Sequence, residues 1–243
     1  MEPASAWARI KHRVLSIRAG KRTLRDIVYP AYVRAYPFVF CMRSFRFDGK
    51  RYGYMFHPYG TTLVSERIVE VPIALEALRA HAGMRVLEVG NVLSHYAECS
   101  HSVLDKYEKA DGCINEDILD YHPAQRFDFV VSVSTVEHIG WNEFEREPEK
   151  AVRALEHMKR LLAPGGSMLV TIPLGYNEYL DRYLRSDRCL FRKMSFLMRS
   201  SPRNQWVQVP AGVAFAAKYG SPYPFANGLV IGYATNEGAA GRG

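Results

Sequence analysis

The stretch that decides the fold reads Val86-Leu87-Glu88-Val89-Gly90. An apolar run that leads directly into glycine is typical of a strand entering a tight turn. Further strands are predicted at Ser102–Leu104, Cys113–Ile114, Phe127–Val133 and Met168–Ile172, and a helix at Glu149–Leu162 that ends at Pro164-Gly165-Gly166. Apolar strands that alternate with helices or turns indicate a parallel sheet covered on both faces. We therefore expect an α/β fold, a Rossmann-like doubly wound sheet that is mostly parallel with an antiparallel last strand.

The remaining segments suggest three regions. Residues 1–60 are expected to form an N-terminal appendage of basic helices, followed by an aromatic hairpin or loop at residues 45–54. Residues 61–235 form the main domain, which begins with a helix near residues 65–78. Within it, residues 174–205 are basic and irregular and are expected to be helical, whereas residues 204–209 and 229–234 are predicted as the last two strands. Residues 236–243 are predicted to be a disordered tail.

Composition excludes several classes of protein. The chain has 243 residues, 48% hydrophobic and 23% charged, which is enough apolar material for a sizeable core without disulfides. Its four cysteines lie far apart without metal-ligand spacing, so a zinc site or disulfide framework is disfavoured. With no apolar leader or membrane-length apolar run, we expect a cytoplasmic protein.

Positive charge is concentrated at the beginning of the chain. The net charge is +7, and residues 1–51 contain twelve Lys and Arg against three Asp and Glu. Such an arm could contact an anionic membrane surface, a nucleic acid or an acidic partner, or it could be a solvated helix face. A homo-oligomer is also compatible with this segment.

Acidic and polar residues follow successive predicted strands. Asp105 ends the second strand, where a carboxylate can accept hydrogen bonds from both hydroxyls of a ribose. Asp117 follows the third strand and could accept from an exocyclic amine. The fourth strand ends in a polar cluster that runs from Ser134 through Glu137 to His138. Parallel strands place ligands at their carboxyl ends, so this edge is the predicted site.

This ordered series resembles the class I S-adenosylmethionine-dependent methyltransferases over residues 65–175, and more weakly up to residue 235. The resemblance implies S-adenosylmethionine as the cofactor and a methyl-transfer activity. The implied cofactor-binding residues are Glu88, Gly90, Asn91, Asp105, Lys106, Asp117, Ile118 and Ser134. A dinucleotide dehydrogenase would share the first two signals but would not explain Glu137-His138 or the turn before the fifth strand.

The first loop departs from the family pattern. The sequence after Glu88 keeps one glycine, Gly90, where the family commonly has three, and the segment before the next strand is too short for a full helix. The part of the pocket for the methionine moiety must then be built differently, and Asn91, His95 or Tyr96 are candidates.

Methyl transfer to an alcohol requires removal of the hydroxyl proton. His138 is the predicted catalytic base, because imidazole titrates near neutrality. Glu137 could orient the imidazole, contact the acceptor or bind a divalent ion such as Mg²⁺. A structural role for both residues, as helix-start or packing groups, is the competing interpretation.

The acceptor is predicted to be a saccharide or another polar small molecule. Tyr176 and Asn177 follow the fifth strand and are the predicted substrate-binding residues. The Asn/Asp-Pro-Pro-Tyr pattern of many nucleic-acid N-methyltransferases is absent, so nucleic acid is disfavoured as a partner. Two alternatives remain open. One is an RNA methyltransferase that uses the basic N-terminal arm, and the other is a cofactor-binding scaffold without catalysis.

Overall fold

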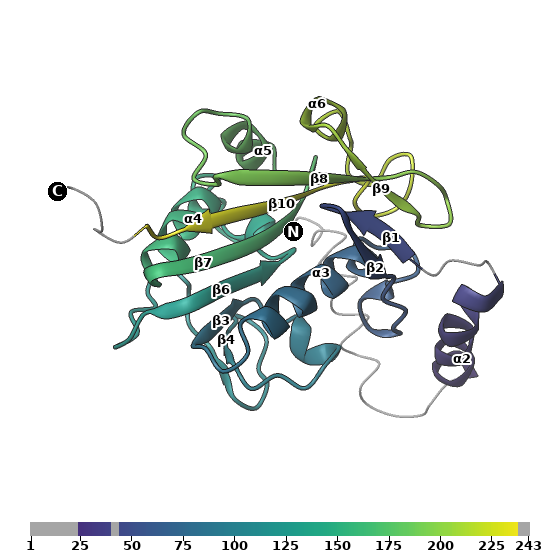
Figure 1. Cartoon of the computed structure of the whole chain (residues 1–243), viewed down its shortest axis with the longest axis horizontal. Helices are drawn as coiled ribbons and strands as arrows, with labels where there is room; N and C mark the ends of the chain where they lie inside the picture. Colours follow the sequence, from purple (N-terminus) through teal and green to yellow (C-terminus); the bar gives the residue numbers. More distant parts are fainter. Residues whose placement is uncertain (1–23, 40–43, 238–243) are drawn as a thin grey trace, which may run out of the picture.

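The computed structural model describes residues 24–39 and 44–237. A central eight-stranded sheet has helices on both faces (Figure 1). Its strands are β3 (Val86–Val89), β4 (Ser102–Leu104), β5 (Cys113–Ile114), β6 (Phe127–Val133), β7 (Leu162–Pro173), β8 (Lys193–Arg199), β9 (Trp206–Val209) and β10 (Gly228–Thr235). The helices are α2 (Leu24–Val39), α3 (Arg67–Ala80), α4 (Lys150–Arg160), α5 (Glu178–Leu184) and α6 (Ala211–Ala214), with 3-10 turns η2 (Tyr59–Thr61), η3 (Leu93–His95) and η4 (Val136–His138). A separate hairpin consists of β1 (Ser44–Phe47) and β2 (Lys50–Gly53).

The strand order is β5-β4-β3-β6-β7-β10-β8-β9. All neighbours from β5 to β7 are parallel, whereas β10 is antiparallel to both β7 and β8. The prediction of a Rossmann-like, mostly parallel sheet with an antiparallel last strand is confirmed. Strand order reverses between β3 and β6, and ligands of such sheets bind outside the carboxyl ends of the strands at this switch point.

Both faces of the sheet are buried, which explains why its strands are apolar throughout. Along β6, Val131 and Val133 pack on the face covered by α3, while Val130 packs on the face covered by α4. The same alternation continues in β7 and β10. Figure 1 shows α3 and α4 on opposite sides of these strands. The core therefore consists of two apolar layers, one on each side of the sheet.

The structure corrects the sequence analysis in the segment after β7. Residues 174–205 were expected to be helical, but only α5 is, and Lys193–Arg199 form strand β8 inside the sheet. The basic residues misled the prediction. Arg199 ends β8 almost fully buried, and its guanidinium donates to the carbonyl oxygens of Val64, Pro202 and Pro224. A charged residue with such distant partners leaves no signature in the local pattern.

A second difference concerns the Pro164-Gly165-Gly166 segment, which was expected to be a turn before a strand. In the structure it lies inside the long strand β7. The backbone N–H of Gly165 donates to the carbonyl of Asn236, and the N–H of Asn236 donates to the carbonyl of Gly166. Pairing with the chain beyond β10 therefore extends the strand through these residues.

The aromatic hairpin is confirmed and is tied to the main sheet. Its two-residue turn, Asp48-Gly49, has positive φ at both positions, as a tight hairpin turn requires. The Asp48 carboxylate accepts hydrogen bonds from Ser195 of β8 and Gln208 of β9 and pairs with Lys193. The hairpin thus joins the edge of the sheet, while the expectation of basic helices before residue 24 lies outside the described residues.

Helix α2 is the only described helix before the hairpin. Its Val33 and Tyr36 pack against the apolar layer on the α3 side. Within the described ranges, no helix is long and apolar enough to cross a membrane. The predicted membrane contact of the N-terminal arm, residues 1–51, stays a prediction, and residues 1–23 and 40–43 of that arm lie outside the described residues.

Asn204 connects β9 to the segment that precedes α3. It adopts a left-handed conformation, with φ of 61°, and is fully buried. Its side-chain amide donates to the carbonyl oxygens of Thr62 (3.0 Å) and Ser65 (2.7 Å), and its oxygen accepts from Trp206 Nε1 (2.8 Å). One side chain therefore satisfies three buried polar groups.

Asn204→Ala should lower the free energy of unfolding by about 3 kcal/mol, because three polar groups lose their partner and alanine is strained at this φ. Urea denaturation measures the loss. Asn204→Gly removes the same hydrogen bonds but tolerates the left-handed conformation, so its loss should be about 1 kcal/mol smaller. Stability of both variants within about 0.5 kcal/mol of the wild type would contradict this role.

Candidate functional site

Glu88 holds the loop after β3 in place through hydrogen bonds to its backbone. This carboxylate is fully buried, and its Oε1 accepts from the backbone N–H groups of Val92 (2.9 Å) and Leu93 (2.7 Å). Its Oε2 lies 2.8 Å from His101 Nε2. Glu88 therefore orders the loop, and its assignment as a cofactor-binding residue stays a prediction.

Gly90 is the one position in this loop where only glycine fits. Its φ is +90°, and a Cβ atom would lie 2.1 Å from Thr135 Oγ1. Its N–H donates to the carbonyl of Leu104. The loop after β3 thus approaches both the end of β4 and the segment after β6, which brings three of the predicted site segments together.

Asp105 fastens the loops after β3 and β4 to each other. Its Oδ2 accepts from the N–H of Asn91 (3.0 Å), while Oδ1 accepts from Tyr107 (2.8 Å) and Glu108 (2.7 Å). The Asn91 side chain is itself buried and accepts from the hydroxyl of Ser94. With three amide donors on two oxygens, the Asp105 carboxylate retains acceptor capacity for a ligand hydroxyl.

Asp117 lies in an ion-pair network beside Asp105. Its Oδ2 is 2.8 Å from the ammonium groups of both Lys106 and Lys150. Both lysines also pair with Glu143. Burial alone would raise the pKa of Asp117, but the hydrogen bonds from the two lysines outweigh it and lower the pKa to about 2. Ile118, the next residue, is buried in the core.

The segment after β6 forms what we call the lip, residues 134–138. Ser134 begins it with φ of 39°, an uncommon value for serine that turns the chain sharply out of the strand. Its hydroxyl donates to Glu70 Oε1 (2.5 Å), and the Thr171 hydroxyl donates to the same oxygen (2.7 Å). Ser134 is therefore engaged with α3 rather than open to solvent.

Glu137 and His138 lie next to each other at the lip but in different environments. Glu137 is almost fully buried, whereas the His138 side chain is 29% exposed. The Nε2 atom of His138 lies 3.5 Å from Glu137 Oε1, and its Nδ1 lies 3.2 Å from the Asn142 side-chain nitrogen. Burial raises the pKa of Glu137 well above its ordinary value. The two side chains therefore place a buried carboxyl group next to an imidazole that reaches solvent.

The predicted substrate residues have different surroundings. Tyr176 is half-buried, its ring packs edge-on against His138 at 4.8 Å, and its hydroxyl accepts from Asn142 (2.6 Å). Asn177 caps α5 through Leu180 and donates to the carbonyl of Glu137 (3.1 Å). The structure thus gives Asn177 a supporting role beneath the lip, while Tyr176 stays beside the imidazole.

Sequence reasoning missed two charged residues of α3, Arg67 and Glu70. Arg67 donates to the carbonyl oxygens of Val133 (3.0 Å) and Ser134 (3.4 Å) at the end of β6. Burial raises the pKa of Glu70 to about 7, with Arg67 opposing the shift and Glu66 adding to it. A signal was present, because Arg67 and Glu70 are charges three residues apart in the apolar first half of a helix.

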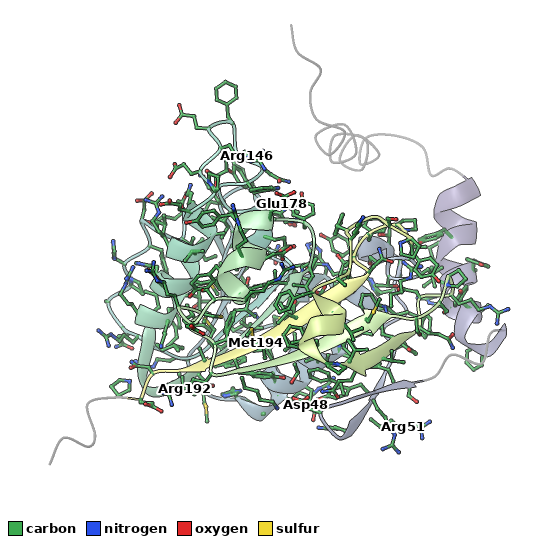
Figure 2. All side chains as sticks on the ribbon, turned by 90° about the horizontal axis from the view of Figure 1, so that it is seen from above. Asp48, Arg51, Arg146, Glu178, Arg192 and Met194 are labelled. Atoms are coloured by element: carbon green, nitrogen blue, oxygen red, sulfur yellow. The ribbon has the colours of Figure 1, made fainter. Side chains whose placement is uncertain are left out.

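Two further features bear on earlier expectations. In residues 24–39 and 44–237, no group of three or more His, Cys, Asp or Glu side chains is arranged to hold a metal ion, so a Mg²⁺ site at Glu137 gains no support. An open cavity of about 610 Å³ is lined by Trp141, Arg146, Arg153, Glu178 and Tyr179, among others. Trp141 follows the lip by three residues, but no residue of the lip itself lines this cavity. Figure 2 shows Arg146 and Glu178 at one side of the molecule, opposite Asp48 and Arg51.

The Asp117 network predicts a defined dependence of stability on pH. The folded pKa of Asp117 is depressed, so its stabilising contribution is present above the unfolded pKa and is lost as pH falls towards about 2. Asp117→Asn should cost about 2 kcal/mol of unfolding free energy at pH 7, and the difference from the wild type should shrink below pH 4. Urea unfolding across this range measures it. The exposed Asp120→Asn serves as the control, and a pH-independent difference for Asp117→Asn would contradict the assignment.

No protein-family model matches the sequence, and no curated protein does. Solved structures with a similar fold include a methyltransferase of Thermotoga maritima described as a possible histamine N-methyltransferase, with 16% identity, a TM-score of 0.39, and coverage of 67% of this chain and 87% of that one. Another is the N-methyltransferase NodS of Bradyrhizobium japonicum with bound S-adenosylhomocysteine, with 15% identity, a TM-score of 0.39, and coverage of 70% and 91%. These likenesses concern the fold alone. The strand order and orientations of the sheet itself are those of the class I S-adenosylmethionine-dependent methyltransferase fold.

Proposed function

We propose that this chain is an S-adenosylmethionine-dependent methyltransferase. The observation that carries the proposal is the convergence of four loops at the carboxyl edge of the sheet. Gly90 packs against Thr135, the N–H of Asn91 donates to Asp105, and Lys106 bridges to Asp117. Ribose hydroxyls would bind at Asp105, and the adenine would lie between Lys106 and Ile118, near Asp117.

Arg67 offers the cofactor a positive charge. The loop after β3, which has one glycine, offers none. Its guanidinium lies at the carboxyl end of β6, held by two backbone carbonyls. A guanidinium in this position suits the carboxylate of the cofactor's methionine moiety. The bound sulfonium would then face the lip, where the acceptor must approach in line with the breaking carbon–sulfur bond.

The acceptor expected from the sequence is a hydroxyl of a saccharide or polar natural product. A supporting feature is the cavity whose lining begins at Trp141, three residues after the lip, and whose aromatic and charged side chains suit a polar ring. The reaction leaves a neutral thioether, so the protein must position the acceptor and remove its proton. His138 is the residue at the lip with access to solvent, and we assign that proton transfer to it.

Calorimetric titration with S-adenosylhomocysteine tests the cofactor assignment. Asp105→Ala should weaken binding about 10- to 100-fold, equivalent to about 1.5–3 kcal/mol, because a charge-assisted acceptor is lost and the loops it joins are loosened. Asp111→Ala, an exposed carboxylate in the same loop between β4 and β5, is the matched control and should bind normally. Unchanged affinity of Asp105→Ala would overturn the placement of the ribose.

His138→Ala should preserve affinity for S-adenosylhomocysteine and lower turnover about 10²- to 10⁴-fold, the usual contribution of a positioned base. Turnover is measured on acceptors found by mass spectrometry in a library of oligosaccharides and polar metabolites. Asn142→Ala, which removes the neighbour of the imidazole but not the base, should lose less activity. Turnover of His138→Ala close to wild type would leave the proton to another group, and loss of activity with chelator would restore the metal hypothesis for Glu137.

A further inference from the structure

Two buried carboxylate oxygens lie behind the lip without a hydrogen-bond partner among the described residues. They are Oε2 of Glu70, on α3, and Oε2 of Glu137, on η4, and both side chains are at most 1% exposed. The other oxygen of Glu70 is occupied by two hydroxyl donors. Buried carboxylates are normally paired, and of these two oxygens only Glu70 Oε2 has a cation nearby, Arg67 Nε at 3.9 Å. Two buried oxygens without a hydrogen bond point to a ligand that the chain itself does not supply.

The charges around these oxygens do not balance. Three buried carboxylates, Glu66, Glu70 and Glu137, influence one another electrostatically, and Arg67 is the cation among them. Arg67 Nε lies 3.9 Å from Glu70 Oε2, while its two terminal nitrogens donate to backbone carbonyls. The fully ionised group would therefore carry an excess of negative charge inside the protein, which favours a cationic ligand.

The proposed cofactor neutralises only part of this excess. S-adenosylmethionine carries a sulfonium, an ammonium and a carboxylate, so it adds one net positive charge. Three carboxylates, one guanidinium and one such cofactor still leave one negative charge. In the free protein the carboxyl groups of Glu70 and Glu137 have raised pKa values, so they take up protons rather than stay charged together. An acceptor with one positive charge allows all three carboxylates to ionise at once.

Aromatic rings line the same region. Tyr176 and Tyr219 pack edge to face at 4.8 Å, and the charges of Glu70 and Glu137 both act on Tyr219. Carboxylates combined with tyrosine rings are the groups that bind ammonium ions, through charge-assisted hydrogen bonds and cation–π contacts. The surroundings therefore select a compact cation with several N–H donors.

We infer that the acceptor is an amine, which binds as its ammonium ion to the open oxygens of Glu70 and Glu137. The inference rests on the proposed function, and it replaces the hydroxyl expected from the sequence with an amino group on the same kind of polar molecule.

The reaction then proceeds without an additional reagent. The ammonium gives one proton to the Glu137 carboxylate, and His138, 3.5 Å away, passes that proton to solvent. The freed nitrogen lone pair forms the new bond to the methyl carbon. The carbon–sulfur bond breaks, and its electron pair remains on sulfur, which becomes a neutral thioether. The product is a protonated N-methylamine.

A binding experiment on the full chain tests the inference without knowledge of the natural acceptor. The protein carries glutamate labelled with ¹³C at the side-chain carboxyl, is saturated with S-adenosylhomocysteine, and is titrated with methylammonium chloride or with methanol. Methylammonium should shift the Glu70 and Glu137 carboxyl resonances saturably, with a dissociation constant of about 10 mM as its two heavy atoms allow. Methanol should not.

Glu137→Gln and Glu70→Gln should each weaken methylammonium binding at least about tenfold, the effect of losing a charged hydrogen-bond acceptor. Glu156→Gln, an exposed residue of α4 that lies outside the cavity lining, should bind as the wild type does. Oε2 of Glu137 has no hydrogen-bond partner among the described residues, so Glu137→Gln keeps the test valid if Glu70→Gln fails to fold.

The outcomes separate the two proposals. If S-adenosylhomocysteine binds but the two resonances do not respond to methylammonium, or respond equally to methanol, the amine inference is overturned and the methyltransferase proposal stands. If S-adenosylhomocysteine itself does not bind, the proposed function fails first.

Discussion

The carboxyl edge of the sheet depends on one buried carboxylate, Glu70. Its Oε1 accepts from Ser134 and Thr171 and thereby joins α3 to the ends of β6 and β7. Ser134 needs this support, because its left-handed backbone would otherwise be strained without compensation. The sharp turn at Ser134 in turn directs the lip, with Glu137 and His138, across the end of the sheet. One carboxylate oxygen, Glu70 Oε1, therefore helps to fix the position of the lip, where the substrate to be methylated is proposed to bind.

The neighbouring loop after β3 is ordered by side chains where related folds rely on glycines. Glu88 binds two of its amides from below, and Asp105 binds a third from the side. Gly90 remains because Thr135 occupies the space of a Cβ atom. Two carboxylates thus order a short loop that keeps a single glycine after Glu88, at the position where a Cβ atom would not fit.

The sheet could be predicted from the sequence because its strands are short apolar runs bounded by turn residues, and β3, β4, β5 and β6 all lie where the pattern places them. Strand β8 could not be predicted, because its last residue, Arg199, is buried against carbonyl oxygens that are far away in the chain. The same holds for the site. Asp105 and Asp117 follow strands and were found, but Arg67 and Glu70 lie inside a helix that reads as core. Their role depends on contacts with the ends of β6 and β7, which cannot be deduced from the local sequence.

Under the proposed function, an adenine that binds near Asp117 would have to displace Lys106 from its ion pairs. Lys106 spans the gap between Asp117 and Glu143, across the side where the adenine would lie. Lys150 contacts the same two carboxylates and is nearly buried, so Asp117 stays paired if Lys106 moves away. The exposed lysine can therefore exchange its carboxylate partners for solvent at a modest cost, while the buried one maintains the position of the aspartate. Under the proposed function, Asp117 therefore keeps its position through Lys150 while Lys106 moves aside for the adenine.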